Sequence, residues 1–135
     1  MSAVAPASPA PRVLSGIQPS GILHLGNYFG AIRQHIALQD THPTNAFYFI
    51  ADYHALTTIH NADVLRGHVF DVALTYLALG LDPARTLLFR QSDIPEIPEL
   101  TWLLTCVCGK GLLNRAHAYK AAVDRNTAEG VDPDA

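Results

Sequence analysis

The sequence has few lysines, few cysteines and no long hydrophobic run. Lys110 and Lys120 are the only lysines in 135 residues, and the formal net charge is −3. A chain with this balance lacks the basic face that nucleic-acid-binding modules present to phosphates, so any contact with RNA must use other groups. Cys106 and Cys108 are the only cysteines. They are too few for a disulfide framework or a zinc site, and they fit a reducing cytoplasm.

Charged residues or prolines interrupt every apolar run before it reaches the roughly 18 residues that a membrane-spanning helix needs. Residues 1–11 are small and proline-rich, without the basic start and apolar centre of a signal peptide. They are predicted to form a disordered tail. Residues 12–135 can form one domain with a hydrophobic core, since 49% of the chain is hydrophobic.

Strand and helix patterns alternate along the first two-thirds of the chain. Short apolar runs at 12–17, 45–51 and 86–90 have the composition of buried strands. Segments at 25–39 and 62–79 repeat apolar residues at helical spacing. The order β-α-β-α-β predicts an α/β fold with a parallel sheet, right-handed crossovers and flanking helices.

Both predicted helices have an apolar face that a sheet could cover. Asn61 can cap the second helix, and Gly80 can end it. Its expected buried face comprises Leu65, Val69, Val72, Leu74, Tyr76, Leu77 and Leu79. The expected buried face of the first helix comprises Leu25, Phe29, Ile32 and Ile36, with Tyr28 alongside.

The last third of the chain is predicted to be helical. Residues 99–108 form an apolar helix, residues 114–125 an amphipathic one, and residues 127–135 a loop. The surface at 100–113 is too apolar to remain exposed, so we expect a second copy of the chain to cover it. Its largest side chains are Trp102, Leu103, Leu104 and Val107.

The most informative stretch is the predicted strand, loop and helix at 15–30. Gln18, Pro19, Ser20 and Gly21 are typical of a turn, and the helix should begin near His24. A helix that begins after a strand directs free backbone N–H groups and the positive end of its dipole toward the sheet edge. This arrangement favours a phosphate at that edge.

The side chains at the predicted helix start also suit a nucleotide. His24 and Asn27 are three residues apart, so they share a face and can donate hydrogen bonds without a permanent charge. Gly26 would let a base or ribose approach the backbone. Common phosphate loops do not fit, because Ile22 and Leu23 occupy the lysine and serine positions of a P-loop. The chain contains no G-x-G-x-x-G motif.

These residues carry a resemblance to a known family. The segment PSGILHLGN at 19–27 resembles the HIGH signature of class I aminoacyl-tRNA synthetases, in the variant that ends with asparagine. The flanking segments SGIQPSG and NYFGA, and IADYHALT at 50–57, resemble the tryptophanyl-tRNA synthetases of that class. The similarity runs from about Val13 to the last residue.

The resemblance implies a Rossmann-like catalytic domain that activates L-tryptophan with ATP and transfers it to tRNA(Trp). ATP would act together with Mg²⁺, and no covalent enzyme intermediate would form. His24 and Asn27 would stabilise charge on the reacting phosphate. The residues that would bind ATP are Gln18, Pro19, Ser20, Gly26 and Asn27.

The resemblance also implies a tryptophan pocket at the first two strands. Leu14 and Gly16 would line it from the first strand, and Ala51 and His54 from the end of the second. His54 could instead be a hydrogen-bonded residue at the edge of the core, and the same alternative applies to Asp52. No residues are predicted to ligate a metal. The remaining histidines show no metal-ligand spacing and are given no role: His35, His42, His60, His68 and His117.

Two family features do not occur in these 135 residues: the lysine-rich KMSKS loop and the aspartate that recognises the indole N–H. We therefore expect residues 12–135 to be the N-terminal part of the catalytic domain of a cytoplasmic homodimer. Two other classes remain open. One is a nucleotidylyltransferase with a similar histidine-containing turn, and the other is a non-catalytic module that binds nucleotide or dimerises. Tyrosine is an alternative amino acid.

Overall fold

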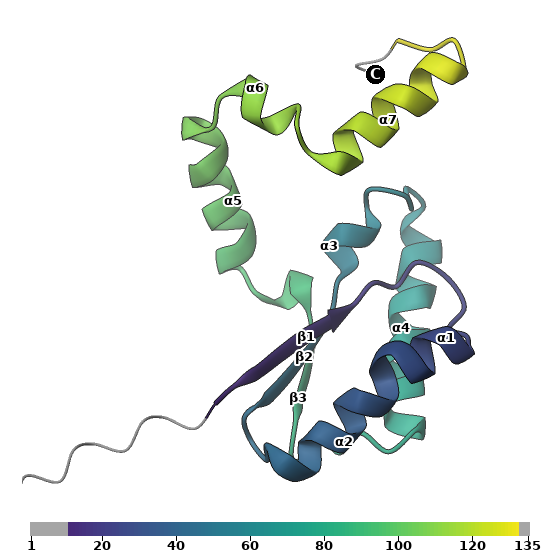
Figure 1. Ribbon diagram of the computed structural model, residues 1–135, viewed down its shortest axis with the longest axis vertical. Helices are drawn as coiled ribbons and strands as arrows, with labels where there is room; N and C mark the ends of the chain where they lie inside the picture. The colour runs from purple at the N-terminus through teal and green to yellow at the C-terminus, as the bar shows by residue number, and fades with distance from the viewer. Residues whose placement is uncertain (1–10, 133–135) are drawn as a thin grey trace, which may run out of the picture. The chain divides into compact units, whose positions relative to one another are not determined.

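The computed structural model describes residues 11–132, so all but one residue of the predicted tail lies outside the described part. The chain divides into two compact units, Met1–Asp93 and Ile94–Ala135. The first contains the sheet and the second is helical (Figure 1).

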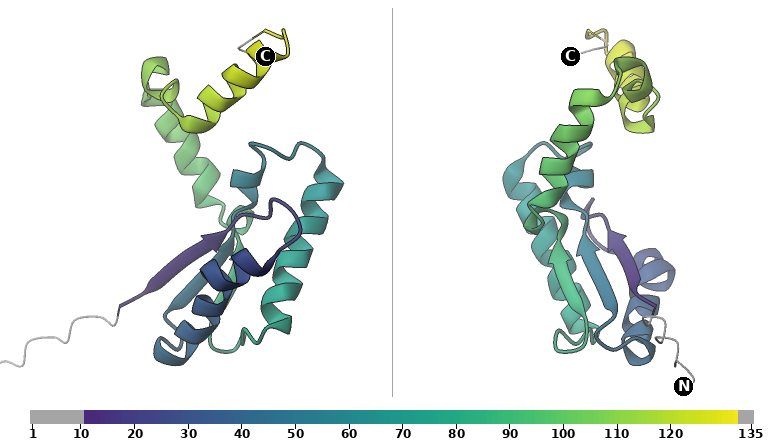
Figure 2. Two further views of the ribbon diagram at one scale, coloured as in Figure 1. Left: turned by 45° about the vertical axis from the view of Figure 1, so that its right-hand side comes forward. Right: turned by 90° about the vertical axis from the view of Figure 1, so that its left-hand side faces the viewer.

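The predicted strands are confirmed as β1 (Val13–Ile17), β2 (Ala46–Ile50) and β3 (Leu87–Arg90). They form a parallel sheet in the order β1-β2-β3. Figure 2 shows the strands side by side with their carboxyl ends at one edge. The fold is therefore α/β with a Rossmann-like parallel sheet, as predicted.

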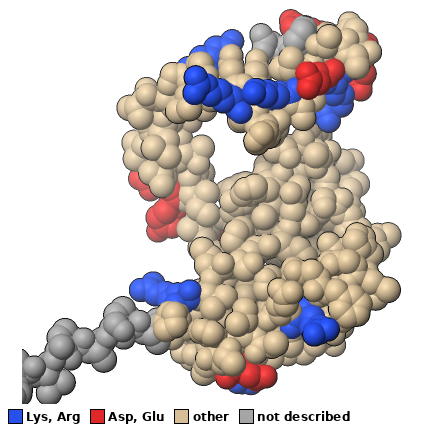
Figure 3. Space-filling view, viewed as in Figure 1, with Lys and Arg blue, Asp and Glu red and all other residues tan. Residues whose placement is uncertain are grey.

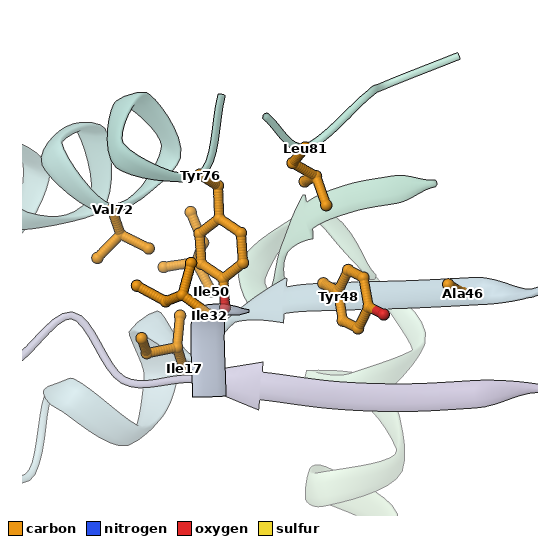
Figure 4. Close-up of a cluster of buried hydrophobic side chains, with 8 residues drawn as sticks. All are labelled: Ile17, Ile32, Ala46, Tyr48, Ile50, Val72, Tyr76 and Leu81. Atoms are coloured by element: carbon orange, nitrogen blue, oxygen red, sulfur yellow. The ribbon is translucent and has the colours of Figure 1, made fainter. Parts of the chain in front are cut away.

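Two helical segments pack on the same face of the sheet. The first comprises α1 (Leu25–Asn27), η1 (Tyr28–Ile32) and α2 (Arg33–Thr41), and the second is α4 (Ala62–Ala78). Two right-handed crossovers that step in one direction along a sheet place their helices on one face. Figure 4 shows the resulting core, which comprises Ile17, Ile32, Ala46, Tyr48, Ile50, Val72, Tyr76 and Leu81.

The predicted ends of α4 are confirmed. The Asn61 side chain accepts hydrogen bonds from the N–H groups of Asp63 and Val64, at 2.9 and 3.1 Å. Gly80 has a φ of +102°, which glycine adopts without steric cost.

The predicted apolar face of α4 is only partly correct. Val72 and Tyr76 are buried, and Leu65 and Val69 are half-buried. Leu74, Leu77 and Leu79 are instead 53%, 48% and 43% exposed. A three-stranded sheet covers a narrower stripe of the helix than the sequence pattern implies.

The first helix contains a π-helical turn, η1, that the sequence analysis did not predict. A π turn inserts one residue, which rotates the preceding segment by about 100° relative to α2. The prediction of a continuous apolar stripe is therefore wrong at Leu25 and Phe29, which are 74% and 55% exposed. The prediction is correct at Ile32, which is buried, and at Tyr28 and Ile36, which pack against the core, and His35 joins this buried face.

The second unit contains α5 (Glu96–Val107), α6 (Lys110–Leu113) and α7 (His117–Ala128). Helix α5 begins three residues before the predicted 99, because Pro98 lies in its first turn, where no intrahelical donor is lost. The prediction of a loop from residue 127 is wrong for its first two residues, which extend α7. Among residues 11–132, no helix combines the length and apolarity needed to span a membrane.

Candidate functional site

The turn after β1 is built as its composition predicts. Pro19 is fully buried, and the Ser20 N–H donates to the Gln18 carbonyl oxygen at 3.0 Å. Gly21 has a φ of +156°, a conformation that residues with a side chain rarely adopt. Because the Pro19 side chain offers no surface, Pro19 can contribute to a site only by shaping the turn, whereas Ser20 is exposed.

His24 and Asn27 form a reciprocal capping box at the start of the helix. His24 precedes the first helical residue, and its Nδ1 accepts a hydrogen bond from the Gly26 N–H at 3.0 Å. The Asn27 Oδ1 in turn accepts from the His24 N–H at 2.9 Å. The two side chains are therefore fixed to each other through the backbone, which is a closer association than the shared face that the sequence predicted.

This capping box determines which hydrogen-bonding groups remain available. An imidazole nitrogen that accepts from a backbone N–H carries no proton, so the proton of neutral His24 is on Nε2. Asn27 uses its oxygen in the cap, which leaves its NH₂ group to donate. His24 is exposed. The turn therefore presents two uncharged donors beside the backbone N–H groups of the helix start.

Gly26 is constrained by the His24 ring. A Cβ at position 26 would lie 2.8 Å from His24 Cε1 and 3.0 Å from its Nδ1. A side chain here would displace the imidazole from its cap. The His24 ring therefore explains why position 26 is a glycine. The approach of a nucleotide to Gly26 stays a prediction.

The ends of all three strands meet beside this turn. The Ala51 N–H donates to the Ile17 carbonyl oxygen at 2.8 Å, and the Gln18 side-chain amide donates to the His54 carbonyl oxygen at 3.4 Å. His54 Nδ1 lies 3.0 Å from Gln91 Oε1, just after β3. The carboxyl edge of the sheet therefore brings Gln18, His54 and Gln91 together. This is the edge where open α/β sheets bind ligands.

Asp52 has a structural role at this edge. It begins the short helix α3 (Asp52–Ala55), which the sequence analysis did not predict. Its Oδ1 accepts from the Ser92 N–H at 3.0 Å, and its Oδ2 accepts from the Ser92 hydroxyl. Asp52 thus joins the end of β2 to the helical turn η2 (Gln91–Asp93).

The predicted pocket residues of β1 lie on the sheet face opposite α2 and α4. Leu14 is 68% exposed there. Gly16 packs against Phe49, since a Cβ at position 16 would lie 2.5 to 2.8 Å from three atoms of that ring. The Phe49 and Phe89 ring centroids are 6.0 Å apart. Gly16 and these rings make an apolar floor on that face.

The other two predicted pocket residues lie at the end of β2. Ala51 is buried at 7% exposure, and His54 is exposed. The structure brings Leu14 and Gly16 together on one face and places His54 at the carboxyl edge, next to Gln18.

A cavity of about 600 Å³ lies elsewhere in the first unit, between the ends of β2 and β3 and the start of α4. Its lining is mostly apolar and includes none of His24, Asn27 or Gln18. The donors converge at the turn and not at this cavity, so the turn is the better candidate site. Among residues 11–132, no three histidine, cysteine, aspartate or glutamate side chains are placed to hold a metal ion.

Gln91 is the site residue that the sequence analysis missed. It follows β3 directly, and its Oε1 is the hydrogen-bond partner of His54 Nδ1. The rule that parallel strands align their carboxyl ends could have identified it, because Asp52 and His54 occupy the equivalent place after β2.

Comparison with known proteins shows the family of this chain. Residues 7–132 match the family model described as tRNA synthetases class I (W and Y). The chain belongs to this family. Members that it resembles include the tryptophan–tRNA ligases of Pseudomonas aeruginosa and Bordetella pertussis, which are 59% and 56% identical over 124 and 123 residues. These matches cover 92% and 91% of this chain but only 28% and 27% of the relatives.

Solved structures of the family share the fold. The tryptophanyl-tRNA synthetase of Campylobacter jejuni superposes with a TM-score of 0.72 at 41% identity, covering 92% of this chain and 37% of that protein. A second structure of the same enzyme, complexed with ADP and tryptophan, gives a TM-score of 0.70 at 41% identity, with 90% and 36% coverage. The chain therefore corresponds to a little over a third of these synthetase structures.

Proposed function

We propose that this chain contributes part of the active site of a tryptophan–tRNA ligase. The observation that supports it most strongly is the capping box at 24–27, which leaves two uncharged donors at the carboxyl edge of a sheet shared with this family. The C. jejuni relative was solved with ADP and tryptophan, the two kinds of ligand that the proposal requires.

The proposed reaction joins the tryptophan carboxylate to the α-phosphorus of ATP. The carboxylate oxygen attacks phosphorus and pyrophosphate leaves, giving tryptophanyl-adenylate; a terminal ribose hydroxyl of tRNA(Trp) then attacks the acyl carbon and releases AMP. Negative charge redistributes over the phosphate oxygens in the first step. The His24 Nε2–H and the Asn27 amide are suited to stabilise it, because they need no rearrangement to donate.

ATP binding in this proposal uses the turn after β1. Gln18 and Ser20 would contact the nucleotide, Pro19 would hold the turn, and Gly26 would lie beneath the adenosine. Mg²⁺ would enter with the triphosphate, because the turn offers no carboxylate ligand. It would neutralise phosphate charge, while His24 and Asn27 orient the α-phosphate.

The tryptophan pocket is proposed on the face opposite the helices. Leu14 and the aromatic floor around Gly16 suit an indole ring, because they are apolar and Leu14 is exposed. His54 would face the amino acid from the edge of the sheet, and Ala51 would support it from the end of β2.

The second unit is proposed to mediate a homodimer. Leu100, Leu103, Leu104 and Val107 repeat at helical spacing on α5 and are 56%, 58%, 56% and 82% exposed. Trp102, 70% exposed, lies on the opposite side of α5, the side that carries Thr105, and is not part of this face. An apolar helix face of this kind is typical of an interface between copies.

Residues 12–135 would form the N-terminal part of the class I catalytic domain of a cytoplasmic enzyme. Lys110 and Lys120 both belong to the second unit, whereas the strands belong to the first. On the face shown in Figure 3, the Lys and Arg side chains do not form one continuous patch. The lysine-rich loop that would hold the triphosphate does not occur in these 135 residues. We therefore expect the chain alone to bind ATP weakly and not to activate tryptophan.

The test is amino-acid-dependent pyrophosphate exchange in a chimera, in which this chain replaces the matched 124-residue segment of the P. aeruginosa ligase. We expect exchange with tryptophan, little with tyrosine, and none with the 135-residue chain alone. Adenylyl transfer by the chain to nicotinate mononucleotide or phosphopantetheine would contradict the proposal and indicate a nucleotidylyltransferase. Exchange by the isolated chain at the rate of the chimera would contradict the expectation that this chain holds only part of the active site.

A further inference from the structure

His35 is a buried histidine in the centre of the first unit. It lies on α2 and is 6% exposed. The sequence predicts no role for it, because it shows no metal-ligand spacing. Its ring stacks on that of Tyr48 with centroids 4.5 Å apart, and lies nearly parallel to that of Tyr76 at 6.0 Å. The Tyr48 hydroxyl donates to the His35 carbonyl oxygen at 2.9 Å.

Both imidazole nitrogens of His35 have hydrogen-bond partners. Nδ1 lies 2.7 Å from the Tyr76 hydroxyl, and Nε2 lies 3.0 Å from the Ser15 hydroxyl. Burial raises the pKa of Tyr76, so its hydroxyl keeps its proton. One arrangement gives every buried donor an acceptor. In it the Tyr76 hydroxyl donates to Nδ1 of His35, and the Nε2–H of His35 donates to Ser15 Oγ.

This chain of hydrogen bonds reaches the strand that carries the proposed site. Ser15 lies on β1 between Leu14 and Gly16, whose positions alternate to the opposite face of the sheet. The same strand leads directly into the turn at 18–20. His35 therefore connects β1 to α4 through Tyr76, and it lies on the helical segment that begins with the capping box.

A proton on Nδ1 of His35 would break this chain. Nδ1 would become a donor facing the Tyr76 hydroxyl, whose own proton would lose its acceptor. The titratable groups that face His35 are Tyr48 from β2 and Tyr76 from α4, and Ser15 is the group from β1. None of these groups is negatively charged near neutral pH, so nothing compensates a buried imidazolium. Burial accordingly lowers the pKa of His35.

We propose that neutral His35 is a positioning residue for the adenylate-forming site, holding β1 and the following turn against α2 and α4, and that protonation of His35 releases this hold and weakens nucleotide binding. The inference rests on the proposed function, because it assumes that ATP binds beside the turn. A histidine that served only to fill the core would not make nucleotide binding depend on its protonation.

The experiment compares the affinity of the 135-residue chain for ATP by calorimetry at about pH 7.5 and about pH 5.5. The informative variant is His35→Phe, which keeps an aromatic ring between the two tyrosines but removes both side-chain hydrogen bonds and the titration. Ionisation of ATP affects wild type and variant equally, so it cancels in their ratio. His117→Gln, at an exposed histidine of α7, is the matched control.

We expect the loss of affinity on acidification to be larger for wild type and His117→Gln than for His35→Phe, by less than about 10-fold, because the pKa of His35 lies below its ordinary value. Ser15→Ala keeps His35 but cuts its link to β1, so it should bind ATP more weakly already at about pH 7.5 and lose less on acidification. This variant keeps the test decisive if His35→Phe does not fold. Parallel losses in all four proteins would overturn the inference alone. No ATP binding by wild type at either pH would overturn the inference, whereas the proposed function is tested separately by exchange in the chimera.

Discussion

At the scale of the residue, one nitrogen atom determines how the turn after β1 can be used. Nδ1 of His24 accepts from the Gly26 N–H, so Nε2 carries the proton and faces away from the cap. A ring held in the other tautomer would lose the cap and offer a lone pair to a phosphate, which would repel it. The capping interaction thus orients the donor as well as stabilising the helix start.

Gly16 gives a prediction about packing. In Gly16→Ala the new methyl group would overlap the Phe49 ring, whose nearest atom would be 2.5 Å away. We expect a loss of about 1–3 kcal/mol in the free energy of unfolding, measured by urea denaturation. The control is Gly67→Ala in α4, where a Cβ meets nothing within 4 Å and should stabilise the helix by about 0.5–1 kcal/mol. Equal stability of Gly16→Ala and wild type would show that Phe49 moves aside freely.

His35 gives a prediction about pH. Its pKa in the folded chain lies below the model-peptide value of 6.5, so the unfolded chain binds the proton more strongly. Stability is therefore fully present above about pH 6.5 and falls as the pH decreases toward the folded-state pKa. Urea midpoints between about pH 7.5 and about pH 5 should fall less for His35→Phe than for wild type. Identical pH dependence of the two midpoints would contradict the assignment of a buried neutral imidazole.

At the scale of the element, α4 depends on its cap. The Asn61 side chain receives two backbone N–H groups of the first turn, and Asn61→Ala would leave both without a partner. We expect a loss of about 1 kcal/mol in the free energy of unfolding. Asn61→Ser keeps an acceptor oxygen and should lose a smaller part of it. The cap would be unimportant if the alanine and serine variants unfolded at the same urea concentration.

The elements were predictable where local chemistry marks their ends. Asn61 marks the start of α4 because a cap oxygen is needed there, and Gly80 marks its end because a positive φ is needed there. The three strands coincide with the apolar runs. The π turn at Tyr28–Ile32 was not predictable, because no residue type marks an inserted residue and only packing shows which face it turns inward. The same rotation exposes Leu25 and Phe29.

The candidate site was partly predictable for a similar reason. The spacing of His24 and Asn27 placed them at one helix start, but their reciprocal hydrogen bonds depend on the backbone geometry of the turn. Gln91 and His35 find their partners across 37 and 41 residues, and no local pattern reveals such contacts.

At the scale of the whole molecule, we predict that the α5 surface defined by Leu100, Leu103, Leu104 and Val107 holds two copies together. In the chimera, the pair Leu103→Glu and Val107→Glu should shift sedimentation at micromolar concentration from dimer to monomer, because it buries two charges in an apolar interface. Thr105→Glu adds a charge on the opposite side of the same helix and should leave the dimer intact. A chimera that sediments only as a monomer would remove the proposed interface.

The central claim is that the capping-box residues stabilise the transition state of tryptophan activation, and the most direct measurement is tryptophan-dependent pyrophosphate exchange by the chimera with His24→Ala and Asn27→Ala combined. Removal of two preorganised donors should lower kcat by a factor on the order of 10² or more, while the dissociation constant for ATP, from calorimetry on the same protein, changes by less than about tenfold. Exchange that continues at the unmodified rate, or a kcat that falls only in proportion to lost ATP binding, would contradict the claim.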